Sequence, residues 1–339
     1  SARIDYASIH ETQFSPRAAV VMSLTPEHKL RFSAGRAFQR PNYSELYRLT
    51  PDAPAFDPNT GAPVNFDAVQ NAIADSIGVL TGTIPEINLN LNAFRANAVG
   101  NENLDVEKIV SYEIGYKGVF GENFYFNADI YYNRLNDFIT NFLPGINPGI
   151  EVWEPDFSGD LAEYNALAYN MVMNALNPRD RQRLSILNGE PVFVVSNANV
   201  GKVDEYGAEL EAGYYFSDAF RLSANYSYFG YDVVQSNVNQ PLLPNTSPHR
   251  FNMTAAYILH KKFDSSLTFQ YSAGFDWMAG TYIGYVPEYT VVHLNGGAYV
   301  FDSFRIGINI FNLFDRKFFQ IFGGTYLPRY TTLKLSYEF

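Results

Sequence analysis

The chain has 339 residues, of which 47% are apolar and 16% aromatic, with a net charge of −11 and no cysteine. The lack of cysteine excludes a disulfide-stapled module and a thiolate metal site, and the negative charge argues against nucleic acid as a ligand, which needs a basic patch. No segment approaches the run of about 18 apolar residues that a membrane-spanning helix requires, so a membrane location would require strands.

Apolar and polar residues alternate with period two along most of the chain. Phe304, Ile306, Ile308 and Ile310, for example, alternate with polar or small residues. Successive side chains on a strand point to opposite faces, so each such segment has one apolar and one polar face. The pattern predicts eleven strands, in chain order at about 14–24, 30–38, 108–119, 124–142, 193–216, 220–232, 250–259, 266–277, 289–300, 304–314 and 329–339.

The connections between these strands alternate between short turns and long loops. The long ones cover about 39–107, 143–192, 233–249, 278–288 and 315–328. Aromatic residues gather at the short-turn ends, including Phe120, Phe124, Phe216 and Phe220. Short turns on one side, long loops on the other and an interfacial aromatic girdle are typical of an outer-membrane barrel. The predicted fold class is therefore all-β, a transmembrane antiparallel β-barrel.

Two long loops carry helical patterns of their own. Apolar residues recur at helical spacing over 66–80 and again over 161–175, and Pro178 is suited to begin a further short helix. A long loop needs an apolar cluster to stay ordered, so packing inside the loop is one interpretation. A lid or a docking surface for a partner is the other.

The ends of the chain also carry information. Bacterial single-chain barrels have an even number of strands, so an odd count indicates the C-terminal part of a larger barrel. The last segment, 333–339, alternates apolar Leu333, Leu335, Tyr337 and Phe339 with charged or polar residues. Such a strand needs a pairing partner, because a bare edge invites mispairing.

Four motifs, spread over nearly the whole chain, resemble those of the TonB-dependent receptors, the active transporters of the bacterial outer membrane. They are GRAFQRPNYSELY at 35–47, NENLDVE at 101–107 leading into SYEIGYK at 111–117, NVGK at 199–202 with YGAELE at 206–211, and NLFD at 312–315 with later Gly323-Gly324 and Pro328-Arg329. The chain departs from the family pattern at Glu102, where proline is usual, and at Phe318-Phe319, where tyrosine is usual.

The resemblance implies a large barrel, occluded by a plug that couples to TonB. Residues 1–339 would be the C-terminal half of a 22-stranded barrel, whose plug and first half have no match in this sequence. It also implies TonB-dependent uptake, across the bacterial outer membrane, of a scarce bulky solute such as a glycan, a siderophore or a cobalamin-like ligand. The implied partners are TonB, outer-membrane lipid and lipopolysaccharide, and the assembly machinery, which would read Leu335, Tyr337 and Phe339 as a signal.

Several residues are candidates for contact with the solute. Glu113, Glu209 and Glu211 fall on the polar phase and should face the lumen, where they would form a charge network with Arg or Lys or else meet the solute itself. The candidates in or next to the loops are Arg40, Tyr43, Trp153, Tyr282 and Tyr285.

The charge of the long loops bears on the solute. Segment 39–107 holds nine acidic and three basic side chains, and 143–192 holds seven acidic and three basic ones. An acidic entrance disfavours anions, which favours a neutral or glycan-like solute over an anionic ferric siderophore. The cluster of Arg179, Arg181 and Arg183 argues the other way.

Catalytic, metal and cofactor sites are not predicted. The five histidines, at 10, 28, 249, 260 and 293, have no i, i+3 or i, i+4 spacing, and no nucleophile elbow or phosphate loop occurs. An enzyme is therefore disfavoured. The remaining alternative is a structural or interaction protein that docks a surface partner through its large loops.

Overall fold

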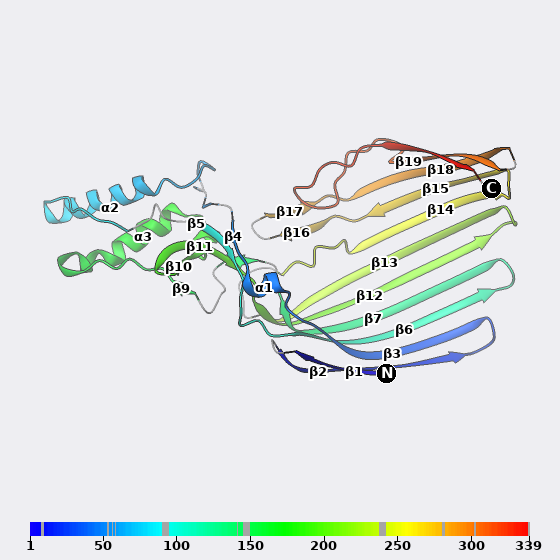
Figure 1. Ribbon diagram of the computed structural model, residues 1–339, viewed down its shortest axis with the longest axis horizontal. Coiled ribbons are helices and arrows are strands. Elements are labelled where there is room, and N and C mark those ends of the chain that lie inside the picture. Colours follow the sequence, from blue (N-terminus) through cyan, green and yellow to red (C-terminus); the bar gives the residue numbers. More distant parts are fainter. Residues whose placement is uncertain are drawn as a thin grey trace.

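Twelve antiparallel strands form one curved sheet, which we call the wall. The computed structural model describes residues 1–7, 10–52, 54–55, 57, 59–89, 95–140, 142–144, 150–236, 242–279, 282–301 and 303–337. Each wall strand pairs with the next wall strand along the chain (Figure 1). In order they are β1 (Ala2–Ala7), β2 (His10–Ser23), β3 (His28–Gln39), β6 (Glu107–Phe120), β7 (Phe124–Ile139), β12 (Asn199–Tyr215), β13 (Phe220–Gln235), β14 (His249–Leu259), β15 (Phe263–Ser272), β18 (Tyr289–Phe301), β19 (Phe304–Phe311) and β20 (Tyr330–Tyr337). Among the described residues, no helix has both the length and the apolarity needed to cross a membrane.

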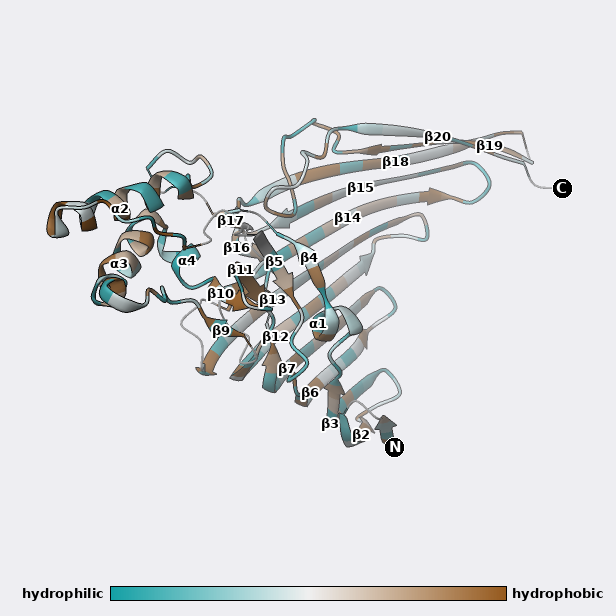
Figure 2. Ribbon diagram, turned by 60° about the vertical axis from the view of Figure 1, so that its left-hand side comes forward, coloured by the Kyte–Doolittle hydropathy of each residue, from teal (hydrophilic) through white to brown (hydrophobic). Residues whose placement is uncertain are grey.

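The wall has one apolar and one polar face, as the alternation predicts. Ile114 and Ile130 are paired across β6 and β7 and are 53% and 62% exposed, which is unusual for isoleucine in a water-soluble protein. The alternation appears as brown and teal bands along the strands (Figure 2). On β20, Leu335 and Tyr337 are also exposed, whereas Phe339 lies outside the described residues.

The short turns lie together at one end of the wall, to the right in Figure 1. Aromatic rings pair across two of them: the ring centroids of Phe120 and Phe124 are 5.5 Å apart, and those of Phe216 and Phe220 are 5.2 Å apart. The long connections extend from the opposite end, so the predicted asymmetry of the two ends is confirmed.

The predicted count of eleven strands is wrong, because β1 precedes the first predicted strand. This strand has only six residues, and no turn precedes it in the sequence to mark where it begins. It pairs with β2 through partners such as Ile4 and Phe14. Twelve is an even number, so the argument from an odd count no longer indicates a larger barrel.

Two predicted strands end elsewhere than expected. The segment 193–216 divides into β11 (Glu190–Ser196), which belongs to a second sheet, and β12 of the wall. The segment 266–277 leaves the wall at Ser272. Beyond it, β16 (Phe275–Ala279) and β17 (Tyr282–Val286) form a separate hairpin, which begins in the expected strand and continues through the expected loop 278–288.

The two longest connections fold together into what we call the loop lobe. It contains six strands: β4 (Leu49–Pro51), β5 (Arg95–Val99), β8 (Leu143–Pro144), β9 (Glu151–Val152), β10 (Leu184–Leu187) and β11. Its helical elements are α2 (Phe66–Thr81), a 3₁₀ segment (Gly159–Tyr164), α3 (Asn165–Ala175) and α4 (Pro178–Arg181), while α1 (Tyr43–Tyr47) lies just after β3. The predicted helices are thus confirmed. Asn65 caps the start of α2, Gly82 ends it with a left-handed backbone, and Pro178 begins α4.

The loop lobe has a hydrophobic core of its own. Ile73 and Ile77 of α2 and Val172 of α3 are fully buried and belong to one cluster with Trp153 and Phe193. Packing inside the loop, the first of the two interpretations of the helical patterns, therefore accounts for these faces.

Side-chain amides join the lobe to the wall. Asn101 donates to the carbonyl of Asn197 at 3.0 Å, and Asn197 donates to the carbonyl of Thr140 at 2.7 Å. The side-chain amide of Asn199 donates to the backbone carbonyls of Asp137 and Asp105 at 2.7 and 3.0 Å. Its oxygen accepts from the backbone amide of Asp105 at 2.7 Å. Two of the family-like motifs, at 101–107 and 199–202, thus supply hydrogen bonds that hold three crossing segments in place.

Candidate solute passage

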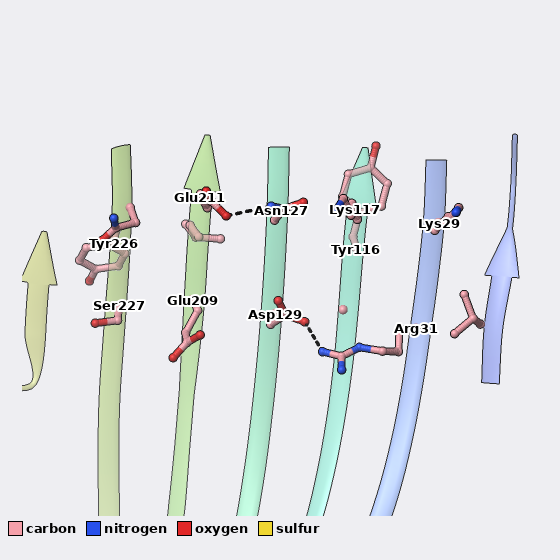
Figure 3. Close-up of a pocket in the computed structure, with 14 residues that line it drawn as sticks. Lys29, Arg31, Tyr116, Lys117, Asn127, Asp129, Glu209, Glu211, Tyr226 and Ser227 are labelled. Atoms are coloured by element: carbon pink, nitrogen blue, oxygen red, sulfur yellow. Dashed lines mark hydrogen bonds and ion pairs between the residues drawn. The ribbon is translucent and has the colours of Figure 1, made fainter. Parts of the chain in front are cut away.

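A groove of about 640 Å³ lies on the polar face, across β3, β6, β7, β12 and β13 (Figure 3). Its charged lining consists of Lys29, Arg31, Lys117, Asp129, Glu209 and Glu211. These side chains come from four strands and face the same space because each falls on the same phase of the alternation. The groove is large enough to hold a polar solute or to form part of its path.

The strand register places these charges in rows. In the row nearer the short turns, Lys29 opposes Lys117, Lys117 opposes Asn127, and Asn127 opposes Glu211. Cations therefore lie on β3 and β6, and the carboxylate lies on β12. Positive and negative side chains are thus separated along this row, from β3 to β12.

In the adjacent row, Arg31 reaches across a whole strand. Its guanidinium donates to Asp129 on β7 at 2.9 Å (Figure 3) and also to Glu113 on β6. Gly115 stands between Arg31 and Asp129 in the register. A Cβ at position 115 would collide with Asp129 Oδ1 and lie 3.3 Å from Arg31 Nε, so the absent side chain is what opens the path.

The same arrangement occurs a second time near the C-terminal edge. Arg305 on β19 donates to Asp264 on β15, with its Nε at 3.0 Å and its Nη2 at 2.6 Å from the carboxylate. Gly297 on β18 opposes Asp264, and a Cβ there would collide with the Arg305 guanidinium. In both cases an arginine side chain passes over a glycine on the neighbouring strand and binds an aspartate on the strand beyond it.

The three predicted lumen carboxylates differ in their partners. Glu113 accepts from Arg31 and, at 3.2 Å, from Ser33, as a charge network requires. Glu211 accepts from Asn127 at 2.9 Å and from Tyr125 at 3.3 Å. Within the described part of the chain Glu209 has no ion-pair partner, and it points into the groove (Figure 3). Its carboxylate is therefore the one most available to a solute.

The structure separates the loop candidates. Tyr43 is 80% exposed at the start of α1, with Arg40 exposed just before it. Trp153, at 4% exposure, lies in the lobe core, which favours a packing role over contact with a solute. Tyr285 lies on β17 at the mouth of the wall, on the side of the long loops, and Tyr282 begins the same strand.

The arginine cluster does not form an anion site. Arg183 is almost fully buried and pairs with Asp180 and Asp52 at 2.8 and 2.9 Å. Arg181 donates to the Leu176 carbonyl at 3.0 Å. Burial lowers the pKa of Arg179, and neighbouring Arg183 lowers it further. The three guanidinium groups therefore do not face a solute together, because Arg183 is buried, Arg179 is half-buried and Arg181 is exposed.

Sequence reasoning missed the basic side of the groove. Arg31, Lys117 and Asp129 lie on the polar phase of predicted strands, and Lys29 directly precedes one, so the alternation could have placed them in the lumen. Their grouping depends on the pairing of β3 with β6 across a connection of more than sixty residues. No local pattern specifies that register.

Known proteins share this architecture. Residues 1–313 match the family model described as "TonB dependent receptor-like, beta-barrel". None of the curated proteins compared with the chain matches it.

Solved structures agree at the level of the fold. The siderophore receptor PirA from Acinetobacter baumannii superposes with a TM-score of 0.63 and 16% identity, over 100% of this chain and 43% of that one. The ferric enterobactin receptor of Pseudomonas aeruginosa gives 0.60 and 14%, over 99% and 41%. The copper transporter OprC gives 0.57 and 16%, over 97% and 40%. The chain thus spans about two fifths of their length. It belongs to the TonB-dependent receptor family, as part of the β-barrel, and its location is the bacterial outer membrane.

Proposed function

We propose that this chain is the C-terminal part of the barrel of a receptor that takes up a scarce, bulky solute with energy from TonB. The observation that carries the proposal is the wall itself, with an apolar outer face and a charged groove on the other face. An apolar face of this extent is stable only against lipid, and charged side chains facing inward need a wet passage. Membership in a family of transporters agrees with the prediction that the chain is not an enzyme.

The rest of the barrel and the plug would complete the passage. In the described residues the outer edges of β1 and β20 have no strand paired to them, so both are open to further strands. The plug would connect the receptor to TonB, and the assembly machinery would read Leu335, Tyr337 and Phe339. Outer-membrane lipid and lipopolysaccharide would cover the apolar face.

The solute would meet the loops first and the groove next. Arg40, Tyr43, Tyr282 and Tyr285 are the proposed contacts at the entrance, and Glu113, Glu209 and Glu211 are those in the lumen. The acidic loops and the internal pairing of Arg183 support a neutral, glycan-like or cationic solute over an anionic ferric siderophore.

Uptake by cells with and without TonB tests the proposal. Cells that express the receptor are offered labelled maltooligosaccharide, cobalamin and a ferric siderophore, and we expect TonB-dependent accumulation of one of them. Glu209→Gln should reduce that accumulation, whereas Glu190→Gln, a change of an exposed carboxylate in the lobe, should not. Equal accumulation with and without TonB for every probe would contradict the proposal.

Docking of a surface partner is a second candidate function, and one observation favours it. Val79 and Leu80 in the last turn of α2 and Ile84 just after it are 85%, 65% and 65% exposed, and α2 lies at the outer end of the lobe (Figure 2). Apolar residues exposed together mark interaction surfaces. Co-purification of a stoichiometric partner that is lost in Leu80→Asp would support this function, and solubilised receptor with no partner would count against it.

A further inference from the structure

A second cavity, of about 270 Å³, lies at the long-loop end of the wall and is distinct from the charged groove. We call it the mouth pocket. Its aromatic lining is Phe229 and Tyr231 of β13, Phe275 of β16 and Tyr285 of β17. Asp276 and Thr246 supply the polar part of the lining. The volume suits a small chemical group and is too small for a whole bulky solute.

Hydrogen bonds hold the loops around this pocket in place. Asn245 donates to the Met278 carbonyl at 2.7 Å and accepts from its amide at 2.8 Å, so a side chain here substitutes for a paired strand. Ser247 donates to the Ala273 carbonyl at 2.8 Å. The β16–β17 hairpin is thereby attached to the loop before β14. A pocket held in this way is formed before any ligand arrives.

Gly274 sets the position of one wall of the pocket. A Cβ at this residue would collide with the Tyr285 hydroxyl, which shows that the ring lies directly over the glycine backbone. Together with Phe229, Tyr231 and Phe275, this ring gives the cavity aromatic lining from three strands.

The chemistry of the lining favours a positive charge. The faces of aromatic rings carry the negative part of their quadrupole, and cages of Tyr and Phe bind ammonium groups. Asp276 lines the pocket and has no ion-pair partner among the residues that the structure describes. The acidic long loops add a field that attracts cations and repels anions.

We propose that the mouth pocket binds a protonated or quaternary ammonium group carried by the solute. The biological meaning of this inference rests on the proposed uptake function, whereas binding itself does not. Arg250 lies behind the lining and donates to the hydroxyl of the lining residue Thr246 at 3.0 Å, so its positive charge opposes that of a cationic ligand. A cationic ligand thus predicts opposite effects for changes at Asp276 and Arg250.

Calorimetric titration of the detergent-purified receptor with choline, methyl glucoside and acetate tests the proposal. We expect saturable binding of choline, weakened about tenfold by Asp276→Asn and strengthened about threefold by Arg250→Gln, because each change alters one Coulomb interaction with the cation. Gly274→Ala should weaken it without any change of charge. Asp218→Asn, which alters an exposed carboxylate in a short turn far from the pocket, should leave affinity unchanged.

The opposite results would overturn the inference. They are no choline binding by a receptor that melts normally, choline binding that is insensitive to both Asp276→Asn and Arg250→Gln, or methyl glucoside bound in place of choline. TonB-dependent accumulation in cells, measured separately, shows whether the proposed function stands when the pocket hypothesis fails.

Discussion

The passage of Arg31 over Gly115 leads to a quantitative prediction about the wall. In Gly115→Ala the new methyl group must displace the Asp129 carboxylate or the guanidinium, since a Cβ collides with Asp129 Oδ1. Overfilling a packed site costs about 1–3 kcal/mol. The side chains of Arg31 and Asp129 are 40% and 32% exposed, so solvent screens the ion pair and its loss adds only about 0.5 kcal/mol. We therefore expect Gly115→Ala to lower the free energy of unfolding by about 1–3 kcal/mol.

A double-mutant cycle isolates the cause. In an Arg31→Met background Asp129 is free to turn away from the new methyl group, so most of the cost of Gly115→Ala should disappear, with a coupling energy of about 1 kcal/mol or more. The matched control is Gly296→Ala on β18, where the nearest atoms to a Cβ are 3.6 and 4.0 Å away. There the alanine should be neutral or stabilise slightly, because it reduces the freedom of the unfolded chain.

The assay is urea unfolding of the protein in detergent, followed by circular dichroism at the β-sheet minimum. Equal unfolding free energies for Gly115→Ala and Gly296→Ala would refute the reasoning. So would a cost of Gly115→Ala that is unchanged in the Arg31→Met background.

Three further predictions concern the loop lobe and its joint. Arg183→Met should destabilise the lobe by about 3–5 kcal/mol, because it removes the cation that balances the buried Asp180 carboxylate; protease should then cut the lobe before the wall, and protection equal to wild type would contradict this. Trp153→Ala should cost about 3–5 kcal/mol of lobe stability through the cavity it leaves, and a normal melting curve with weakened solute binding would show a contact role instead. Asn197→Ala removes the hydrogen bond to Thr140 and should cost about 1–3 kcal/mol, with faster amide exchange at 197–199 as the measurement and unchanged exchange as the contrary result.

The elements that were predicted well are those whose signal is local. Period-two alternation identified eleven of the twelve wall strands, since lipid on one side and water on the other impose the pattern residue by residue. The helices α2 and α3 followed from helical spacing of apolar residues, and α4 from its proline. The missed strand β1 is the shortest of the wall strands, and six residues contain too few repeats of the alternation to stand out.

Strand boundaries were predicted wrongly where one alternating segment pairs with strands of two different sheets. The run 193–216 reads as a single strand, yet its first part pairs in parallel with β5 of the lobe and its second part pairs with β7 of the wall. Both sheets need the same alternating, β-branched sequence. The change of partner at Asn197 and Ala198 is decided by the amide joint, which the local sequence does not reveal.

The sequence by itself determined the class of this protein: the alternation, the short and long connections and four motifs sufficed for an outer-membrane barrel of the TonB-dependent type. The tertiary structure alone decided which charges meet, because Arg31 and Asp129 are 98 residues apart and come together only through strand register and the gap at Gly115. It also moved Trp153 and Arg183 from the candidate surface to the lobe interior. Alternation reports on the environment of each residue, whereas pairing over long distances depends on the packing of the whole chain.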